Sequence, residues 1–260
     1  MKSIIFVAML TLLLSCNSKK EIMRMPGAYN MLSSSVFDGE KDTTYTTLKE
    51  FKIFTYNYMM YVNLSPNDSI SRFGIGSYSA DSGKVIESII FGATDTVSSS
   101  NPATFMLVIE KTDKGYKQVI PELVSRGKKY RLTEDYQSVS TDAKTPLDGA
   151  WKLVKACRIA GTDTTVENVT RFKTFFAGHF VLGQTYPGSN KRLHTEIAYG
   201  KFELTGKSQL KETVETNTCY QLDKKEIDRE IELNGNGLCK QTRINKDGSK
   251  EVEEYQLLKP

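Results

Sequence analysis

The sequence predicts an all-β protein made of two tandem eight-stranded antiparallel barrels that arose by internal duplication. Three observations support this fold class: an ordered internal repeat, strand-like alternation in both copies, and turn residues between the strands. We expect the barrels to span residues 26–140 and 147–260, joined near residue 145. A leader over residues 1–15 and a tether over residues 16–25 precede them.

The leader has the pattern of a bacterial secretory signal. A short basic start, Met1-Lys2-Ser3, precedes an apolar run from Ile4 to Leu14. An uncleaved anchor helix is the alternative, but a membrane span needs about 20 apolar residues. Leu13-Leu14-Ser15-Cys16 resembles the lipobox of bacterial lipoproteins. The resemblance implies cleavage before Cys16, a lipid on that residue and a membrane contact through the lipid; Asn17 favours the outer membrane.

The internal repeat keeps its order along the whole chain. Gly27-Ala28-Tyr29 returns as Gly149-Ala150-Trp151, and Phe51-Lys52-Ile53-Phe54 returns as Phe172-Lys173-Thr174-Phe175. Near the two ends, Glu134-Asp135-Tyr136-Gln137 returns as Glu253-Glu254-Tyr255-Gln256. Chance could produce one such match but is a poor explanation for the ordered series, so a duplication is indicated.

Both copies have the composition and alternation of short β-strands. In the first copy the expected strands are 28–36, 44–55, 58–64, 72–79, 84–91, 104–111, 115–120 and 129–137. In the second they are 150–159, 164–176, 178–184, 196–204, 208–216, 225–233, 237–244 and 250–258. Eight strands per copy fit an up-and-down barrel that closes on itself; a β-sandwich is the alternative.

Charge and cysteine content narrow the function classes. The formal net charge of +4 gives no basic face for nucleic acid, so no nucleic-acid partner is expected. Three cysteines follow Cys16: Cys157, Cys219 and Cys239. They are either buried free thiols or include one bridge, for which Cys219–Cys239 is the first choice. Their spacing predicts no metal site and no cofactor.

The second copy resembles lipocalin-like domains. Gly149-x-Trp151 at the start of an eight-strand meander is similar to the first-strand motif of lipocalins, in which the Trp closes one barrel end and packs on a late-strand Arg, here Arg243. Residues 172–180, 199–206 and 210–215 resemble domains of secreted and lipid-anchored proteins of the Bacteroidetes group. The first copy, with Tyr29 in place of Trp, follows through the repeat. The resemblance implies ligand binding without naming a ligand.

An eight-stranded barrel can enclose one small ligand, and inward polar groups would orient it. In the second copy we expect Lys173, His179 and Glu212 to do so, with Tyr199 and Trp151 as apolar wall; Lys52 and Tyr58 are the counterparts in the first copy. Two alternatives remain, because half of a strand's side chains face solvent. Lys173 and Glu212 could be surface charges, and His179 could simply begin a strand.

The expected function is binding of a small apolar or amphipathic molecule, or a glycan, without catalysis. The sequence has no Gly-x-Ser-x-Gly elbow, no His-Glu-x-x-His motif and no phosphate-binding glycine loop. A Cys157–His179 nucleophile pair has no local support. The alternative is recognition of a glycan or protein at the cell surface through exposed aromatic side chains, among them Tyr56, Tyr58 and Tyr61.

Overall fold

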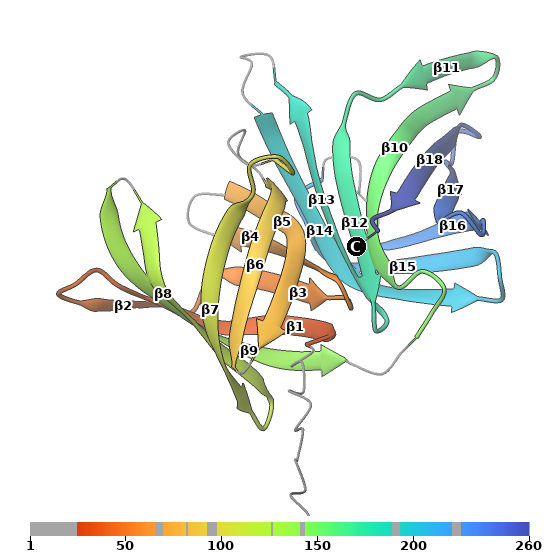
Figure 1. Cartoon of the computed structure of the whole chain (residues 1–260). Helices are drawn as coiled ribbons and strands as arrows, with labels where there is room; N and C mark the ends of the chain where they lie inside the picture. The colour runs from red at the N-terminus through yellow and green to blue at the C-terminus, as the bar shows by residue number, and fades with distance from the viewer. Residues whose placement is uncertain are drawn as a thin grey trace, which may run out of the picture.

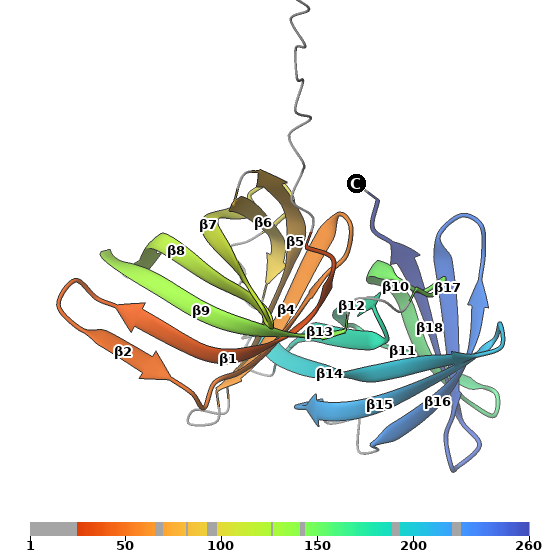
Figure 2. The ribbon, with the colours of Figure 1, turned by 90° about the horizontal axis from the view of Figure 1, so that it is seen from below.

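The computed structural model describes residues 25–65, 70–81, 83–92, 98–125, 127–140, 144–188, 193–219 and 225–259. None of them forms a helix, so no helix in this part of the chain is long and apolar enough to cross a membrane. The expected leader and the lipidation site Cys16 lie outside the described residues. Two closed antiparallel barrels lie side by side (Figures 1 and 2), which confirms the predicted fold class.

The first barrel is closed by pairing of its first and last strands. Its strands are β1 (Gly27–Phe37), β2 (Asp42–Tyr45), β3 (Lys49–Phe54), β4 (Tyr58–Ser65), β5 (Ile70–Asp81), β6 (Lys84–Gly92), β7 (Ala103–Thr112), β8 (Gly115–Ser125) and β9 (Lys128–Ser140). All except β2 form the eight-stranded wall, in the order β1-β3-β4-β5-β6-β7-β8-β9.

The second barrel repeats this topology and closes through β10 and β18. Its strands are β10 (Gly149–Ala160), β11 (Asp163–Val166), β12 (Thr170–Phe176), β13 (His179–Pro187), β14 (Leu193–Thr205), β15 (Gln209–Asn217), β16 (Glu226–Leu233), β17 (Leu238–Ile244) and β18 (Lys250–Leu257). The two closed barrels agree with the fold that the lipocalin resemblance implies.

One expected strand in each copy is two strands in the structure. The segment 44–55 divides into β2 and β3, and 164–176 divides into β11 and β12. The reason is the length of β1, whose first half pairs with β3 and whose second half pairs with β2. The four residues of β2 are all exposed, as are those of β11, so each forms a solvated ribbon that projects beyond the barrel wall.

A β-bulge occurs at the same position in both barrels. The β5–β6 register shifts at Gly76, and the β14–β15 register shifts at Gly200. A Cβ atom at Gly76 would lie 2.0 Å from the carbonyl oxygen of Ser88, and one at Gly200 would lie 2.0 Å from that of Thr213. Glycine is therefore required at both bulges, because only glycine lets the neighbouring backbone approach so closely.

Two expectations about the second barrel are corrected. Trp151 lies opposite Leu257 on β18, whereas Arg243 on β17 lies opposite Glu251, six residues from Leu257 along β18. This separation keeps the Trp151 ring from packing on Arg243, and its indole N–H donates instead to the backbone oxygen of Leu147 at 2.8 Å. Cys219 and Cys239 do not form a bridge: both are buried free thiols, as is Cys157.

An apolar interface joins the barrels through the outer faces of β3–β5 and β12–β14 (Figures 1 and 2). Phe51 stacks on Tyr199 with ring centroids 4.9 Å apart, and Phe91 contacts Phe172 at the same separation. The ring of Phe73 lies against the β13 backbone at Gly183, where a Cβ atom would be 2.3 Å from the ring. These strands are consequently buried on both faces, one against the lumen and one against the other barrel.

Candidate functional site

Strand alternation directs one lysine into each lumen. In β3, Phe51 and Ile53 belong to the interface between the barrels, so Lys52 and Phe54 point the other way, into the first lumen. In β12, Phe172 belongs to the same interface, and Lys173 and Phe175 point into the second lumen. Lys52 is 2% exposed and Lys173 is fully buried. A buried ammonium needs partners, because removing it from water without compensation is strongly unfavourable.

The partners of Lys52 form a polar cluster across the first lumen. Its Nζ lies 2.7 Å from Glu87 Oε1 on β6 and 3.3 Å from Gln118 Oε1 on β8. The Gln118 amide donates to Glu134 Oε2 on β9. The Tyr136 hydroxyl lies 2.5 Å from Glu50 Oε1 and 3.1 Å from Glu134 Oε2.

This first-lumen cluster, which we define as Glu50, Lys52, Glu87, Gln118, Glu134 and Tyr136, contains three carboxyl groups and one ammonium. Burial and then the neighbouring Glu50 raise the pKa of Glu134 to about 8, against the opposing effect of Lys52. Burial also raises the pKa of Glu50. A single phenol proton cannot serve both carboxylates near Tyr136, which agrees with a protonated carboxyl there at neutral pH.

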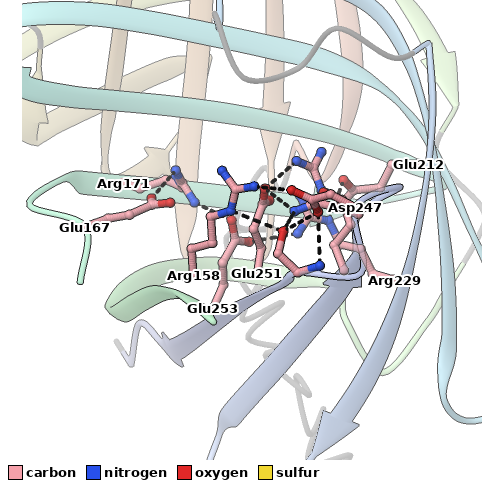
Figure 3. Close-up of polar contacts among 11 residues, drawn as sticks. Arg158, Glu167, Arg171, Glu212, Arg229, Asp247, Glu251 and Glu253 are labelled. Carbon is pink, nitrogen blue, oxygen red and sulfur yellow. Dashed lines mark hydrogen bonds and ion pairs between the residues drawn. The ribbon is translucent and has the colours of Figure 1, made fainter. Parts of the chain in front are cut away.

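The second lumen holds a corresponding network with more cations (Figure 3). Lys173 contacts Glu212, and the Arg229 guanidinium bridges two carboxylates: Nε lies 3.4 Å from Glu212 Oε2, and Nη1 lies 3.2 Å from Glu253 Oε2. Arg171 also pairs with Glu253. In these contacts, each buried carboxylate pairs with at least one buried cation, which offsets the cost of removing both from water.

The pKa shifts reflect this compensation. Burial alone would raise the pKa of Glu253, but Arg229, Arg171 and Lys173 hold it well below its usual range. Burial, assisted by Arg229, lowers the pKa of Lys173 despite its contact with Glu212. The second network therefore keeps Glu253 ionised at neutral pH, in contrast to the proton-sharing cluster of the first barrel.

The pairing registers identify equivalent positions in the two lumens. Glu87 and Glu212 occupy the same position, opposite Tyr78 and Phe202 on the preceding strand. Glu134 pairs with Gln118 as Glu253 pairs with Gln241. Both barrels thus retain five inward residues: Lys52, Glu87, Gln118, Glu134 and Tyr136 in the first, and Lys173, Glu212, Gln241, Glu253 and Tyr255 in the second.

The same registers show where the barrels differ. Leu107 faces Val85, two residues before Glu87, and Arg229 faces Leu210, two residues before Glu212. Leu107 is therefore the counterpart of Arg229. Glu50, two residues before Lys52, is the counterpart of Arg171. Ile120 and Leu132 replace the Arg243–Glu251 ion pair of the second barrel.

These differences decide how much space each lumen contains. The second lumen retains a cavity of about 20 Å³, room for about one water. The first retains about 180 Å³. Its polar end includes Glu50, Lys52, Glu87, Asn63, Gln118 and Glu134, and its apolar part is formed by Ile89, Phe105, Ile120, Leu123 and Leu132. A pocket with a few convergent polar groups and an apolar wall is typical of a small-molecule site.

A hollow of about 350 Å³ also lies at the mouth of the second barrel. Its lining is polar apart from Val169, and its polar groups already pair with one another: Gln184 donates to Glu196, and Arg171 donates to Gln184. This lining lacks the apolar wall of the first cavity. We therefore take the first lumen as the candidate site.

The structure places the residues expected to bind a ligand in two separate locations. Lys52, Lys173 and Glu212 lie in the lumens, so Lys173 and Glu212 are not surface charges. Trp151 lies in the core of the second barrel. The lumenal orientation expected for His179, Tyr199 and Tyr58 is corrected, because their side chains lie on the outer side of the barrel wall.

These three residues belong to the surface between the barrels. His179 lies 5.6 Å from Phe51, centroid to centroid, and burial lowers its pKa. Tyr58 packs against the same apolar cluster and donates to the backbone oxygen of Lys259 at 2.7 Å. Phe172, which precedes Lys173, turns outward into this surface, and strand alternation carries His179 and Tyr199 to the same side.

Several site residues were not expected from the sequence: Glu50, Glu87, Gln118, Glu134 and, in the second barrel, Arg229 and Glu253. One signal for two of them was present, because Glu134-Asp135-Tyr136 and Glu253-Glu254-Tyr255 are repeat matches. The alternation in these segments puts Glu and Tyr on one face, and closure of the barrels turns that face inward.

Comparison with known proteins assigns neither a family nor a function to this chain. No protein-family model matches the chain, and no curated protein matches its sequence. Among the described residues, no group of three His, Cys, Asp or Glu side chains could hold a metal ion.

Proposed function

We propose that this chain is a lipid-anchored binding protein of the bacterial cell envelope whose first barrel encloses a small molecule without transforming it. The observation that carries the proposal is the cavity of about 180 Å³ in the first lumen, beside a filled second lumen. An engineered apolar cavity of about 150 Å³ suffices to bind benzene. The first lumen therefore suits a molecule of about that size.

The lining supports an amphipathic ligand. Buried polar groups at one end would orient the molecule, and the aliphatic and aromatic side chains at the other would receive its apolar part. The alternative of surface recognition through Tyr56, Tyr58 and Tyr61 receives less support. Tyr56 is 48% exposed, but Tyr58 packs against the interface and Tyr61 lines the first cavity, so the three rings do not form one exposed patch.

Native mass spectrometry of the chain purified in detergent from its own host tests enclosed binding. We expect one small molecule per chain. The adduct should disappear in Ile120→Trp, which adds bulk to the cavity wall, and persist in Val108→Trp, which introduces the same side chain on the outer face of β7, where Val108 is 42% exposed. A chain without adduct, or an adduct that survives Ile120→Trp, would overturn the proposal.

The anchor is tested separately by mass analysis of the N-terminal peptide. We expect a chain that begins at Cys16 and carries a diacylglyceryl thioether and an amide-linked acyl group. An unmodified Cys16, or cleavage at another bond, would contradict the lipobox interpretation while leaving the lumen proposal intact.

A further inference from the structure

The second lumen contains a buried cation that the first lumen lacks. In the second lumen, the guanidinium of Arg229 contacts Glu212 and Glu253. In the first lumen, Glu87 and Glu134 stand at the equivalent positions, but the residue equivalent to Arg229 is Leu107. Leucine has no charged group and is shorter than arginine. Glu87 and Glu134 both line the first cavity, and among the described residues that line it Lys52 is the one cationic side chain.

We propose that the first lumen binds a small organic cation, an ammonium or amidinium with an apolar substituent, whose charged group bridges Glu87 and Glu134. The inference rests on the proposed function and names the class of its ligand. The charged end occupies the position of the Arg229 guanidinium, and the substituent lies against Ile89, Phe105, Ile120, Leu123 and Leu132.

The charges in the first lumen favour a cation over an anion. Three carboxyl groups, Glu50, Glu87 and Glu134, face one ammonium, Lys52. The second barrel has Arg171 and Arg229 where the first has Glu50 and Leu107, so two cations of the second lumen correspond to an acid and an apolar residue in the first. A bound cation would restore the balance that Arg229 provides in the second barrel.

One further acceptor is present at the site. Asn63 lines the cavity, and its Nδ2 donates to Glu50 Oε2 at 3.4 Å. Among the side-chain atoms of the described residues, its buried Oδ1 is one of those without a hydrogen-bond partner. An ammonium has three N–H donors, so a ligand that contacts two carboxylates retains a donor for this oxygen.

The site also predicts a proton exchange on binding. The groups that face Glu134 are Glu50, Lys52, Glu87, Tyr61, Tyr116 and Tyr136. Because the pKa of Glu134 is raised to about 8, a cation that requires the ionised carboxylate displaces its proton at lower pH. The affinity for a cation should then fall about tenfold per pH unit below pH 8.

Isothermal titration calorimetry of the purified chain in detergent with three matched probes tests the inference: 2-phenylethylamine, 2-phenylethanol and phenylacetate. At pH 8 we expect the amine to bind about tenfold or more tightly than the alcohol, and phenylacetate to bind most weakly. Glu134→Gln should remove the preference for the amine with little change in shape. Leu107→Arg, which installs the second barrel's own cation, should abolish amine binding. Glu110→Gln, on the exposed face of β7, should change neither the binding of the amine nor its preference over the alcohol.

The outcomes separate this inference from the proposal on which it rests. If the alcohol or phenylacetate binds as tightly as the amine, or if Glu134→Gln retains the preference, the cation is wrong but enclosed binding stands, provided that Ile120→Trp still blocks the probe. If none of the probes binds and the chain from its host has no adduct, both are wrong. Glu134→Gln is near-isosteric, so the test remains decisive should Leu107→Arg fail to fold.

Discussion

Replacing Glu134 by glutamine should make the stability of the first barrel less dependent on pH. The pKa of Glu134 is raised from 4.5 to about 8 in the folded chain because burial and the neighbouring Glu50 disfavour its charge. Between these pH values the folded state holds a proton that the unfolded state has released. The stability contributed by this group is complete below pH 4.5 and is lost as pH rises toward 8. The loss is about 1.4 kcal/mol per pH unit and about 5 kcal/mol in all.

Glutamine resembles the protonated carboxyl in shape and cannot ionise. Glu134→Gln should therefore match the wild-type chain to within about 1 kcal/mol at pH 5 and become more stable than it by up to about 5 kcal/mol at pH 9. Urea unfolding followed by circular dichroism at each pH measures the difference. Glu110→Gln, which alters an exposed carboxylate, should follow the wild-type profile. A difference between Glu134→Gln and wild type that is the same at every pH would refute a protonated Glu134.

Three further results are expected. Arg229→Leu should destabilise the chain by about 3–5 kcal/mol because it leaves Glu212 and Glu253 short of a cation. In thermal melts, millimolar n-propylguanidinium should recover part of this loss of stability. Identical melting curves without and with this cation would contradict the reasoning. Gly183→Ala should cost about 1–3 kcal/mol in urea unfolding, because the new methyl group meets the Phe73 ring at the interface between the barrels; a neutral effect would show that the barrels do not pack as described. The thiols of Cys157, Cys219 and Cys239 are buried, so thiol titration should find them unreactive in the folded chain and fully reactive after unfolding. Rapid labelling of these thiols in the native chain would contradict their burial.

The architecture was predictable because each barrel repeats a pattern that the chain contains twice. Strand alternation put Lys52 and Phe54 on one face of a strand, and the repeat transferred that placement to Lys173 and Phe175. The alternation could not tell which face of a strand meets a second apolar surface. Phe51 and Phe172 face the other barrel, so the residues that share their side of the wall, among them His179, were expected in the wrong place.

The partners of the lysines were harder to predict for a different reason. Lys52 lies on β3 and Glu134 on β9, far apart in the first copy. Only the pairing of β1 with β9 closes the wall and brings the two side chains into one lumen. Likewise, Leu107 and Arg229 could be recognised as equivalent positions only from the strand registers of the two barrels. Cavity space and charge balance are properties of the closed barrel, and the alternation along a single strand does not contain them.

A crystal structure of the chain with 2-(4-bromophenyl)ethylamine tests the central claim most directly, because anomalous scattering from bromine locates the ligand and its orientation. We expect the ammonium nitrogen within hydrogen-bond distance, about 2.7–3.2 Å, of both Glu87 and Glu134, with the bromophenyl ring against Ile120 and Leu132. Bromine density only outside the first lumen, or a ligand with its ring toward the carboxylates and its ammonium in solvent, would contradict the claim that the first barrel is a site for an organic cation.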